Sequence, residues 1–290
     1  MKQNQSSQSA LGVAGFRAIE SQKPEGSRIC YDPYARAFIP TVTYVLVKLI
    51  VDSGLYERMA PGAVGFITVR ERYIDDYLKT GLTEGPDQVV ILGAGFDTRA
   101  YRIPGIEKTH VFEIDFPATQ EVKRKGLKKV IDPVPRYVSL VPMDFNTQSL
   151  GKQLAASGYN EQAKTLFIWQ GVTYFLEAKG VDSTLDFIAN HSGPGSSVIF
   201  DYMYNEIFQD PNNSYGKLLK RSAKLSGEEY MFGIDRGQVE PFLTRRGFRN
   251  VNSMTLEQLK QRYFTGPNAG RAVPADIAIV SAVVNKGEDK

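Results

Sequence analysis

Short apolar runs alternate along the chain with segments in which apolar residues recur every three or four positions. A run closed by glycine or polar residues predicts a buried strand, and the 3-and-4 spacing predicts an amphipathic helix. The helical spacing is clearest at 62–80, where we expect the helix to end at Gly81. Strands are predicted at 89–92, 111–117, 136–145, 165–176, 193–203, 248–255 and 275–287, and helices at 118–130, 147–158, 177–191, 239–248 and 256–264. This alternation predicts a single α/β domain over residues 11–290, with a Rossmann-like, seven-stranded, mostly parallel sheet and helices on both faces.

The segment before the first strand and one segment after the fifth do not fit the alternation. Residues 1–10 are polar and lack the apolar stretch of a secretory signal, so we expect a disordered tail there. Residues 11–37 predict helix, loop and helix. Together with predicted helices at 41–59 and 62–80, they form a helical cap over residues 11–80. Residues 204–235, rich in Asn, Tyr, Lys and Ser, predict a lid insertion.

A glycine turn follows the first predicted strand directly. Gly93-Ala94-Gly95 closes the run 89–92, and Asp97 or Thr98 is placed to cap a following helix. Strand, glycine turn and helix start are typical of the nucleotide-binding corner of an α/β sheet, where glycine lets a ligand approach the backbone. Thr98 stands where a dinucleotide fingerprint has its third glycine, which favours a nucleoside ligand without a pyrophosphate.

Carboxylates gather at the predicted carboxyl ends of the strands. Glu113 and Asp115 end the second strand, twenty or so positions after Gly93, and Asp144 ends the third. Because parallel strands end at one edge of a sheet, we expect these acids and Asp97 to lie along the same edge. At least one of Glu113 and Asp115 is predicted to bind a ribose, the alternative being that both are solvated carboxylates.

Composition narrows the class of protein only slightly. The chain is 42% hydrophobic and 23% charged with a net charge of +3, which gives no indication of nucleic-acid or membrane binding. Its single cysteine, Cys30, excludes an intramolecular disulfide and a cysteine zinc cluster, and fits a reducing, cytoplasmic setting. No spacing of ligands predicts a metal site. The lysine-rich helix at 118–130 is interpreted as a solvated face.

Several motifs, in this order, resemble a class I S-adenosylmethionine-dependent methyltransferase of the leucine carboxyl methyltransferase family, in its small-molecule O-methyltransferase branch. They are RAIES (17–21), DPYARAF (32–38), VRERYIDDYL (69–78), VVILGAGFDTRAYRI (89–103), VFEIDFP (111–117), MDF (143–145) and FIWQGVTYFL (167–176). The resemblance covers nearly the whole chain. It implies S-adenosyl-L-methionine as cofactor and S-adenosyl-L-homocysteine as product.

The resemblance also implies which residues bind the cofactor. Arg70 matches the arginine that holds the methionyl carboxylate, with Arg17 beside it, and Asp115 matches the acid on the ribose. Gln170 is a departure, because many members have Glu there; an amide oxygen still accepts a hydrogen bond but carries no charge. The complete implied set is Arg17, Arg70, Gly93, Ala94, Gly95, Asp97, Glu113, Asp115, Met143, Asp144, Phe145 and Gln170.

No general base stands out in the sequence. His110 precedes the second strand and His191 ends a helix, and both are interpreted as structural or surface residues. Displacement at a sulfonium needs alignment more than acid–base help, so an acceptor already ionised at neutral pH would suffice. A carboxylate fits, and so would a phenol of low pKa. Tyr174 and Tyr202 are candidate catalytic residues, with core packing as the alternative.

The predicted activity is methyl transfer to an oxygen of a small-molecule acceptor, in secondary metabolism. One alternative is carboxyl methylation of a protein C-terminus. Another is an NAD(P)-dependent oxidoreductase, disfavoured by Thr98 and by the lack of a Tyr-x-x-x-Lys pair. A non-enzymatic nucleoside-binding protein is the third. The sequence predicts no oligomeric state.

Overall fold

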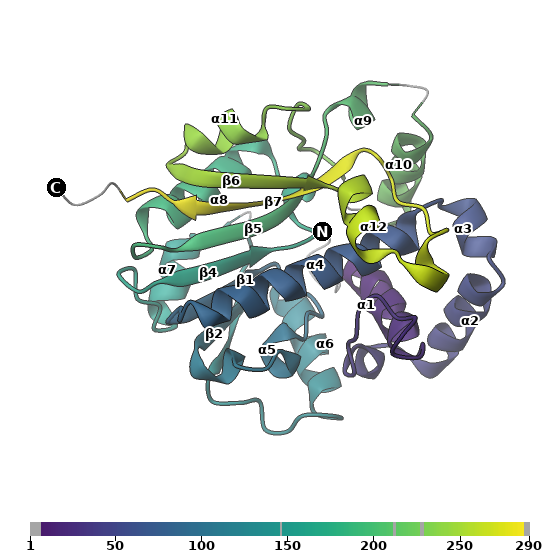
Figure 1. Cartoon of the computed structure of the whole chain (residues 1–290). Coiled ribbons are helices and arrows are strands. Elements are labelled where there is room, and N and C mark those ends of the chain that lie inside the picture. The colour runs from purple at the N-terminus through teal and green to yellow at the C-terminus, as the bar shows by residue number, and fades with distance from the viewer. Residues whose placement is uncertain (1–6, 146, 211–212, 227–228, 287–290) are drawn as a thin grey trace.

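A computed structural model describes residues 7–145, 147–210, 213–226 and 229–286. It contains one seven-stranded sheet in the order β3-β2-β1-β4-β5-β7-β6, with helices on both faces (Figure 1). The strands are β1 (Gln88–Leu92), β2 (His110–Asp115), β3 (Val138–Pro142), β4 (Thr165–Trp169), β5 (Ser197–Met203), β6 (Phe248–Thr255) and β7 (Ile277–Val284). Strands β1 to β5 pair in parallel, and β7 is antiparallel to both of its neighbours. The predicted α/β class and mostly parallel sheet are therefore confirmed.

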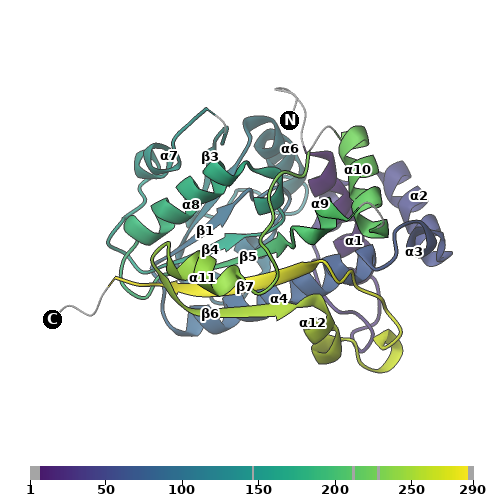
Figure 2. The same ribbon diagram turned by 90° about the horizontal axis from the view of Figure 1, so that it is seen from above.

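The helices cover the two faces in separate groups, as the turned view shows (Figure 2). One face is covered by α7 (Leu150–Ala156), α8 (Ala178–Asn190) and α11 (Val239–Thr244). The other is covered by α4 (Ala63–Thr83), α5 (Arg99–Arg102) and α12 (Leu256–Tyr263). Helix α6 (Pro117–Leu127) connects β2 to β3 along the chain. Because side chains alternate along a strand, Val90 and Leu92 of β1 enter the first core, while Val89 and Ile91 enter the second.

The long helix α4 extends beyond its predicted end. We expected Gly81 to terminate it, but the helix continues to Thr83. A Cβ on Gly81 would lie 2.4 Å from Leu166 Cδ1, so this glycine lets the helix pack closely on β4. The prediction of a C-cap was wrong because a packing glycine and a capping glycine look alike in a sequence.

The N-terminal region is more ordered and more broken than its sequence pattern predicts. Helix α1 (Gln8–Ser21) begins inside the predicted disordered tail, and the Ser7 hydroxyl caps it by accepting from Ala10 N at 3.1 Å. Disorder was therefore wrong for residues 8–10, while 1–6 lie outside the described residues. The second helix predicted within 11–37 is only a 3-10 turn, η1 (Ala35–Phe38). The helix predicted at 41–59 is divided at Ser53 and Gly54 into α2 (Thr41–Asp52) and α3 (Leu55–Met59).

Both views place α1, α2 and α3 together at one end of the sheet, with α10 (Ser214–Ser226) beside them (Figures 1 and 2). Helix α10 and the short α9 (Glu206–Gln209) belong to the predicted lid insertion, of which residues 211–212 and 227–228 lie outside the description. The remaining 3-10 turns are η2 (Ile106–Lys108), η3 (Thr173–Phe175) and η4 (Gly266–Asn268). Among the described helices, each is too short or too polar to cross a bilayer.

Candidate active site

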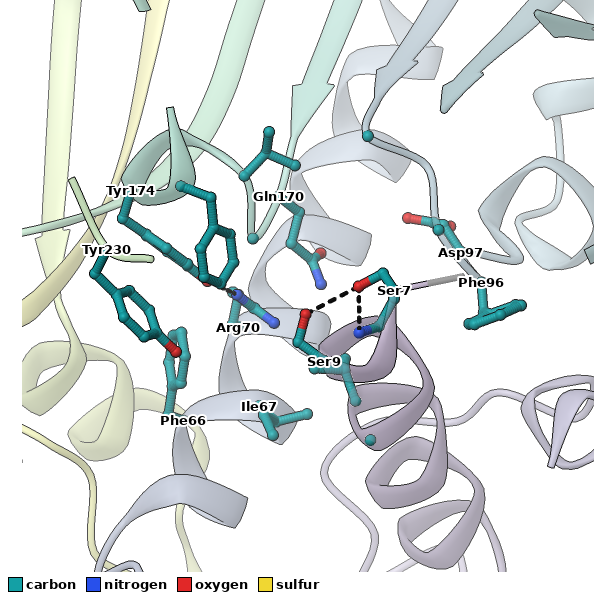
Figure 3. A pocket seen from close by; sticks show the side chains of 18 of the residues that line it. Ser7, Ser9, Phe66, Ile67, Arg70, Phe96, Asp97, Gln170, Tyr174 and Tyr230 are labelled. Atoms are coloured by element: carbon teal, nitrogen blue, oxygen red, sulfur yellow. Dashed lines mark hydrogen bonds between the residues drawn. The ribbon is translucent and has the colours of Figure 1, made fainter. Parts of the chain in front are cut away.

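A cavity of about 640 Å³ lies at the carboxyl ends of the parallel strands, between the sheet and helices α1, α3, α4 and α10. This volume is in the range of small-molecule and cofactor sites. Phe66, Tyr174 and Tyr230 stand on one side of it and Ser7, Ser9 and Asp97 on the other, with Arg70 and Gln170 between (Figure 3). Of the predicted cofactor residues, those that line the cavity are Arg17, Arg70, Gly93, Ala94, Gly95, Asp97, Asp115, Asp144, Phe145 and Gln170.

The glycine turn forms part of the cavity floor. Gly93 has φ +64°, and a Cβ there would lie 2.3 Å from Val172 Cγ2, so only glycine fits without displacing the segment after β4. Asp115, at the end of β2, accepts from Gly95 N at 2.5 Å and from Phe116 N at 2.6 Å. Burial raises the pKa of Asp115, and these two backbone hydrogen bonds oppose the rise. Asp115 therefore lies beside the glycine turn at the carboxyl ends of the strands, as the sequence predicts.

Arg17 supports this corner from α1. Its Nη2 donates to the Phe96 carbonyl at 2.5 Å, and its Nε lies 3.0 Å from Asp32 Oδ2. Arg17 therefore holds the backbone of the glycine turn as well as lining the cavity.

A buried charge cluster lies behind the turn. Glu71, on α4, contacts Arg102 Nη2 at 2.7 Å and Arg99 Nη2 at 3.1 Å, while Arg99 Nη1 contacts Asp97 Oδ2 at 2.5 Å. Burial alone would raise the pKa of Glu71, but Arg99, Arg17 and Arg102 outweigh it and hold the pKa well below its usual range. The carboxylates of the cluster are therefore ionised and already paired.

Gln170 connects the charge cluster to the cavity. Its Nε2 donates to Glu71 Oε2 at 3.1 Å, which fixes the orientation of the amide. Its Oε1 is buried and has no hydrogen-bond partner among the described residues. Because a buried acceptor without a partner is costly, Oε1 is a ready acceptor for a ligand donor in the cavity.

Arg70 projects from α4 into the middle of the cavity. Its Nη1 donates to Asp201 Oδ2 at 2.5 Å and to the Tyr174 hydroxyl at 3.2 Å, and its guanidinium lies 4.5 Å from the Phe66 ring centroid. Its Nε is buried without an acceptor among the described residues. Burial and the nearby Asp201 carboxylate raise the pKa of Tyr174 well above its ordinary value.

Three predicted site residues do not reach the described lining of the cavity. Glu113 lies two positions before Asp115, inside the sheet, where Lys123 Nζ pairs with it at 2.7 Å. Met143 packs its side chain into the core under α7 and α8, although its neighbours Asp144 and Phe145 line the cavity. Tyr202 lies on the opposite face of β5 from Asp201, with its hydroxyl 3.1 Å from Ser253 Oγ. Its candidacy as a catalytic residue was wrong.

Lys123 itself corrects another prediction. It lies on the helix interpreted as a solvated lysine face, yet it is only 1% exposed and paired with Glu113. Its partner, Glu113, is the residue predicted as a ribose ligand. Both predictions failed because a buried ion pair joins this residue of β2 to Lys123 of α6.

Several lining residues were missed. Ser7 and Ser9 were assigned to the disordered tail, and Tyr215 and Tyr230 lie in an insertion without a recognisable pattern. Asp201, which pairs with Arg70, could have been identified from the sequence as an acid at the end of the predicted fifth strand. His110 and His191 lie outside the described lining, beside Ser139 and Glu161. No group of metal-ligating side chains occurs among the residues that the structure describes.

Residues 10–189 match the model of the leucine carboxyl methyltransferase family. The chain belongs to this family. The assignment accounts for the glycine corner and the acid at the end of β2, and it decides against an NAD(P)-dependent oxidoreductase.

Curated relatives carry names that agree with the family. A Bacillus subtilis protein named "Putative S-adenosyl-L-methionine-dependent methyltransferase YktD" is 31% identical over 199 residues, which cover 68% of this chain and 65% of that protein. A Mycobacteroides abscessus protein with the same description is 29% identical over 286 residues, covering 90% of this chain and 88% of that one.

Solved structures show the same fold at low identity. A Thermobifida fusca protein described as a "putative methyltransferase" has a TM-score of 0.57 at 10% identity, covering 94% of both chains. The CurJ carbon methyltransferase has a TM-score of 0.50 at 16% identity, covering 94% of this chain and 67% of that one. This chain therefore shares its fold with these two proteins.

Proposed function

We propose that this methyltransferase uses S-adenosyl-L-methionine to methylate a carboxylate oxygen of a small-molecule acceptor. The observation that carries the proposal is which ionisable side chains line the cavity around Arg70. The cavity presents tyrosine hydroxyls whose pKa values burial raises, at Tyr56, Tyr174 and Tyr215, and no histidine among its described lining residues. A wall of this kind suits an acceptor that needs no deprotonation.

The residues present fit the cofactor. Gly93 and Gly95 line the cavity without side chains, and Asp115 lies beside them with carboxylate oxygens that can accept hydrogen bonds from ribose hydroxyls. The buried Oε1 of Gln170 would accept from the methionyl ammonium, and the buried Nε of Arg70 would donate to the methionyl carboxylate. Neither buried atom has a hydrogen-bond partner among the described residues, and one is an acceptor for an ammonium while the other is a donor for a carboxylate. When bound, the cofactor supplies a methyl group on a sulfonium, whose leaving group is a neutral thioether.

A carboxylate acceptor is the simplest nucleophile for this site. Carboxyl groups have ordinary pKa values near 4, so the acceptor is ionised at neutral pH and no side chain has to remove a proton. The task left to the protein is to align the acceptor oxygen and exclude water. The rings of Phe66 and Tyr174 and the buried Arg70–Asp201 pair serve both tasks, because they contact one another across α4, η3 and β5.

The chemical stability of the product tests the proposal. The protein is incubated with S-adenosyl-L-methionine labelled in its methyl group, together with a small-molecule extract or with peptides ending in a free carboxylate. Methyl esters release labelled methanol in mild alkali, whereas ethers and N-methyl groups do not. We expect alkali-labile label in the small-molecule fraction; alkali-stable label would refute carboxylate methylation, and label confined to peptide C-termini would refute a small-molecule acceptor.

A further inference from the structure

We infer that the acceptor is an aromatic monocarboxylic acid, bound in an apolar half of the cavity that begins at Arg70 and is roofed by α10. The inference rests on the proposed function and extends it to the class of acceptor. For brevity this half is called the acceptor chamber. Its lining is Phe66, Tyr174, Phe175, Tyr215, Leu218, Leu219, Tyr230 and Met231.

Three mutually packed rings form one wall of the acceptor chamber. The ring centroids of Tyr174 and Phe175 are 4.8 Å apart, those of Phe175 and Tyr230 are 4.8 Å apart, and those of Tyr174 and Tyr230 are 5.7 Å apart. Phe66 lines the same cavity, with the Arg70 guanidinium 4.5 Å from its ring centroid (Figure 3). Aromatic ligands gain offset and edge-to-face contacts with such a wall, at separations that these rings already adopt among themselves.

The roof is apolar inside and basic outside. Leu219 is 7% exposed and lines the chamber together with Tyr215, whereas Lys217 and Lys220 on the same helix are exposed. Met231 N donates to the Tyr174 carbonyl at 2.8 Å, which fastens the segment after α10 to η3. The chamber wall is therefore apolar apart from its tyrosine hydroxyls and Glu229, which precedes Tyr230 and also lines the cavity.

The charges in the cavity limit the acceptor to one carboxylate. Arg17 and Arg70 are the cationic side chains among the described lining residues, and each already pairs with a buried aspartate, Asp32 or Asp201. The one carboxylate that reacts is placed toward the cofactor sulfonium. A second carboxylate on the acceptor would lie in the apolar chamber without a counter-ion, which is strongly unfavourable.

Matched acids test the acceptor class. 3-Phenylpropanoate, phenylsuccinate and propanoate differ by one carboxylate or by the ring, and a wider set of aromatic monoacids is paired with diacids in the same way. We expect alkali-labile methyl ester with the aromatic monoacids, at a kcat/KM about tenfold or more above that of the diacids and the ring-free acids. Equal use of diacids or ring-free acids would overturn the inference while leaving the proposed function intact. Cofactor binding without ester from any acid would refute the proposed function itself.

Variants locate the discrimination in the chamber. Leu219→Gln places an amide in the roof, and Met231→Gln does the same at a side chain that is 49% exposed, where folding is little affected. Leu46→Gln is the matched control, because Leu46 is 55% exposed on α2 and lies outside the described lining. We expect both chamber variants to raise KM for aromatic acids about fivefold or more with unchanged cofactor affinity, and the control to match the parent. An unchanged KM in a folded Met231→Gln protein would overturn the placement.

Discussion

Replacing Gln170 by glutamate should destabilise the protein in a pH-dependent way. Gln170 Nε2 donates to Glu71 Oε2 at 3.1 Å, and the pKa of Glu71 is held well below its usual range, so Glu71 stays ionised. Gln170→Glu would turn this donor into a second carboxylate facing the first. The neutral amide is thus the residue that this particular charge cluster requires.

The size of the effect follows from the distance between the two groups. At 3.1 Å and an effective dielectric constant of about 20, two carboxylates repel by about 5 kcal/mol. Protonation of one carboxylate removes this repulsion, and it costs about 1.4 kcal/mol for each pH unit above the ordinary glutamate pKa of about 4.3. The penalty is therefore limited to about 1 kcal/mol near pH ~5, and it can approach the full repulsion near pH ~8.

The direction of the pH dependence is fixed by the sign of the shift. The folded-state pKa of the introduced carboxyl is raised above its unfolded value, so the penalty grows as pH rises from about 4.3 toward the raised pKa. Urea unfolding of the parent and Gln170→Glu proteins near pH ~5 and ~8 should show the difference in unfolding free energy growing by about 2 kcal/mol or more. Gln170→Met is the control, since it loses the hydrogen bond without gaining a charge. A penalty for Gln170→Glu that is the same at both pH values would refute the reasoning.

Three further predictions concern the turn and the cluster. Asp115→Ala should weaken S-adenosyl-L-methionine binding by about 1.5–3 kcal/mol, or roughly 10- to 150-fold, in calorimetry; an affinity within about twofold of the parent would remove Asp115 from the ribose site. Gly93→Ala should cost more stability than Gly85→Ala and also lower cofactor affinity, because both glycines have positive φ but only at Gly93 does a Cβ meet a neighbour, Val172; equal losses in thermal unfolding would count against the close approach. Glu71→Gln should make the unfolding free energy fall less steeply as the pH is lowered. The lowered pKa of Glu71 means that its contribution is present above about pH 4.3 and disappears as pH falls through its folded-state pKa, so an equally steep fall in urea titrations would contradict the ion-pair account.

Much of the fold could be predicted because its signals are local. The apolar run before Gly93 and the alternation of strands with helices depend on residues close together in the chain, and the structure reproduces them in the predicted order. Boundaries failed where a contact from elsewhere decided them. Gly81 lies inside α4, where it packs against Leu166 and leaves no room for a Cβ. The division of helix 41–59 is local instead, because Gly54 has φ +72° and a Cβ there would meet nothing within 4 Å.

The candidate site could be predicted only where chemistry and position on the sheet agreed. Asp115 ends its strand and lies at the cavity, whereas Glu113, two residues earlier, lies about 6.6 Å deeper at ~3.3 Å per residue and is covered by Lys123. The sequence shows that Lys123 is charged but not that it points inward. Tyr202 failed for a similar reason, because alternation along β5 places it on the face opposite Asp201. The acceptor chamber depends on α10 and η3 lining one cavity, which no local pattern indicates.

The atom that receives the methyl group tests the central claim most directly. S-Adenosyl-L-methionine carrying ¹³C in its methyl group is turned over with an aromatic monocarboxylic acid, and the product methyl is observed by ¹³C NMR without separation. We predict one new resonance at the chemical shift of a methyl ester, whose methyl protons show a three-bond correlation to the carboxyl carbon of the acid. A resonance typical of a methyl group on nitrogen, carbon, sulfur or an ether oxygen would contradict carboxylate methylation.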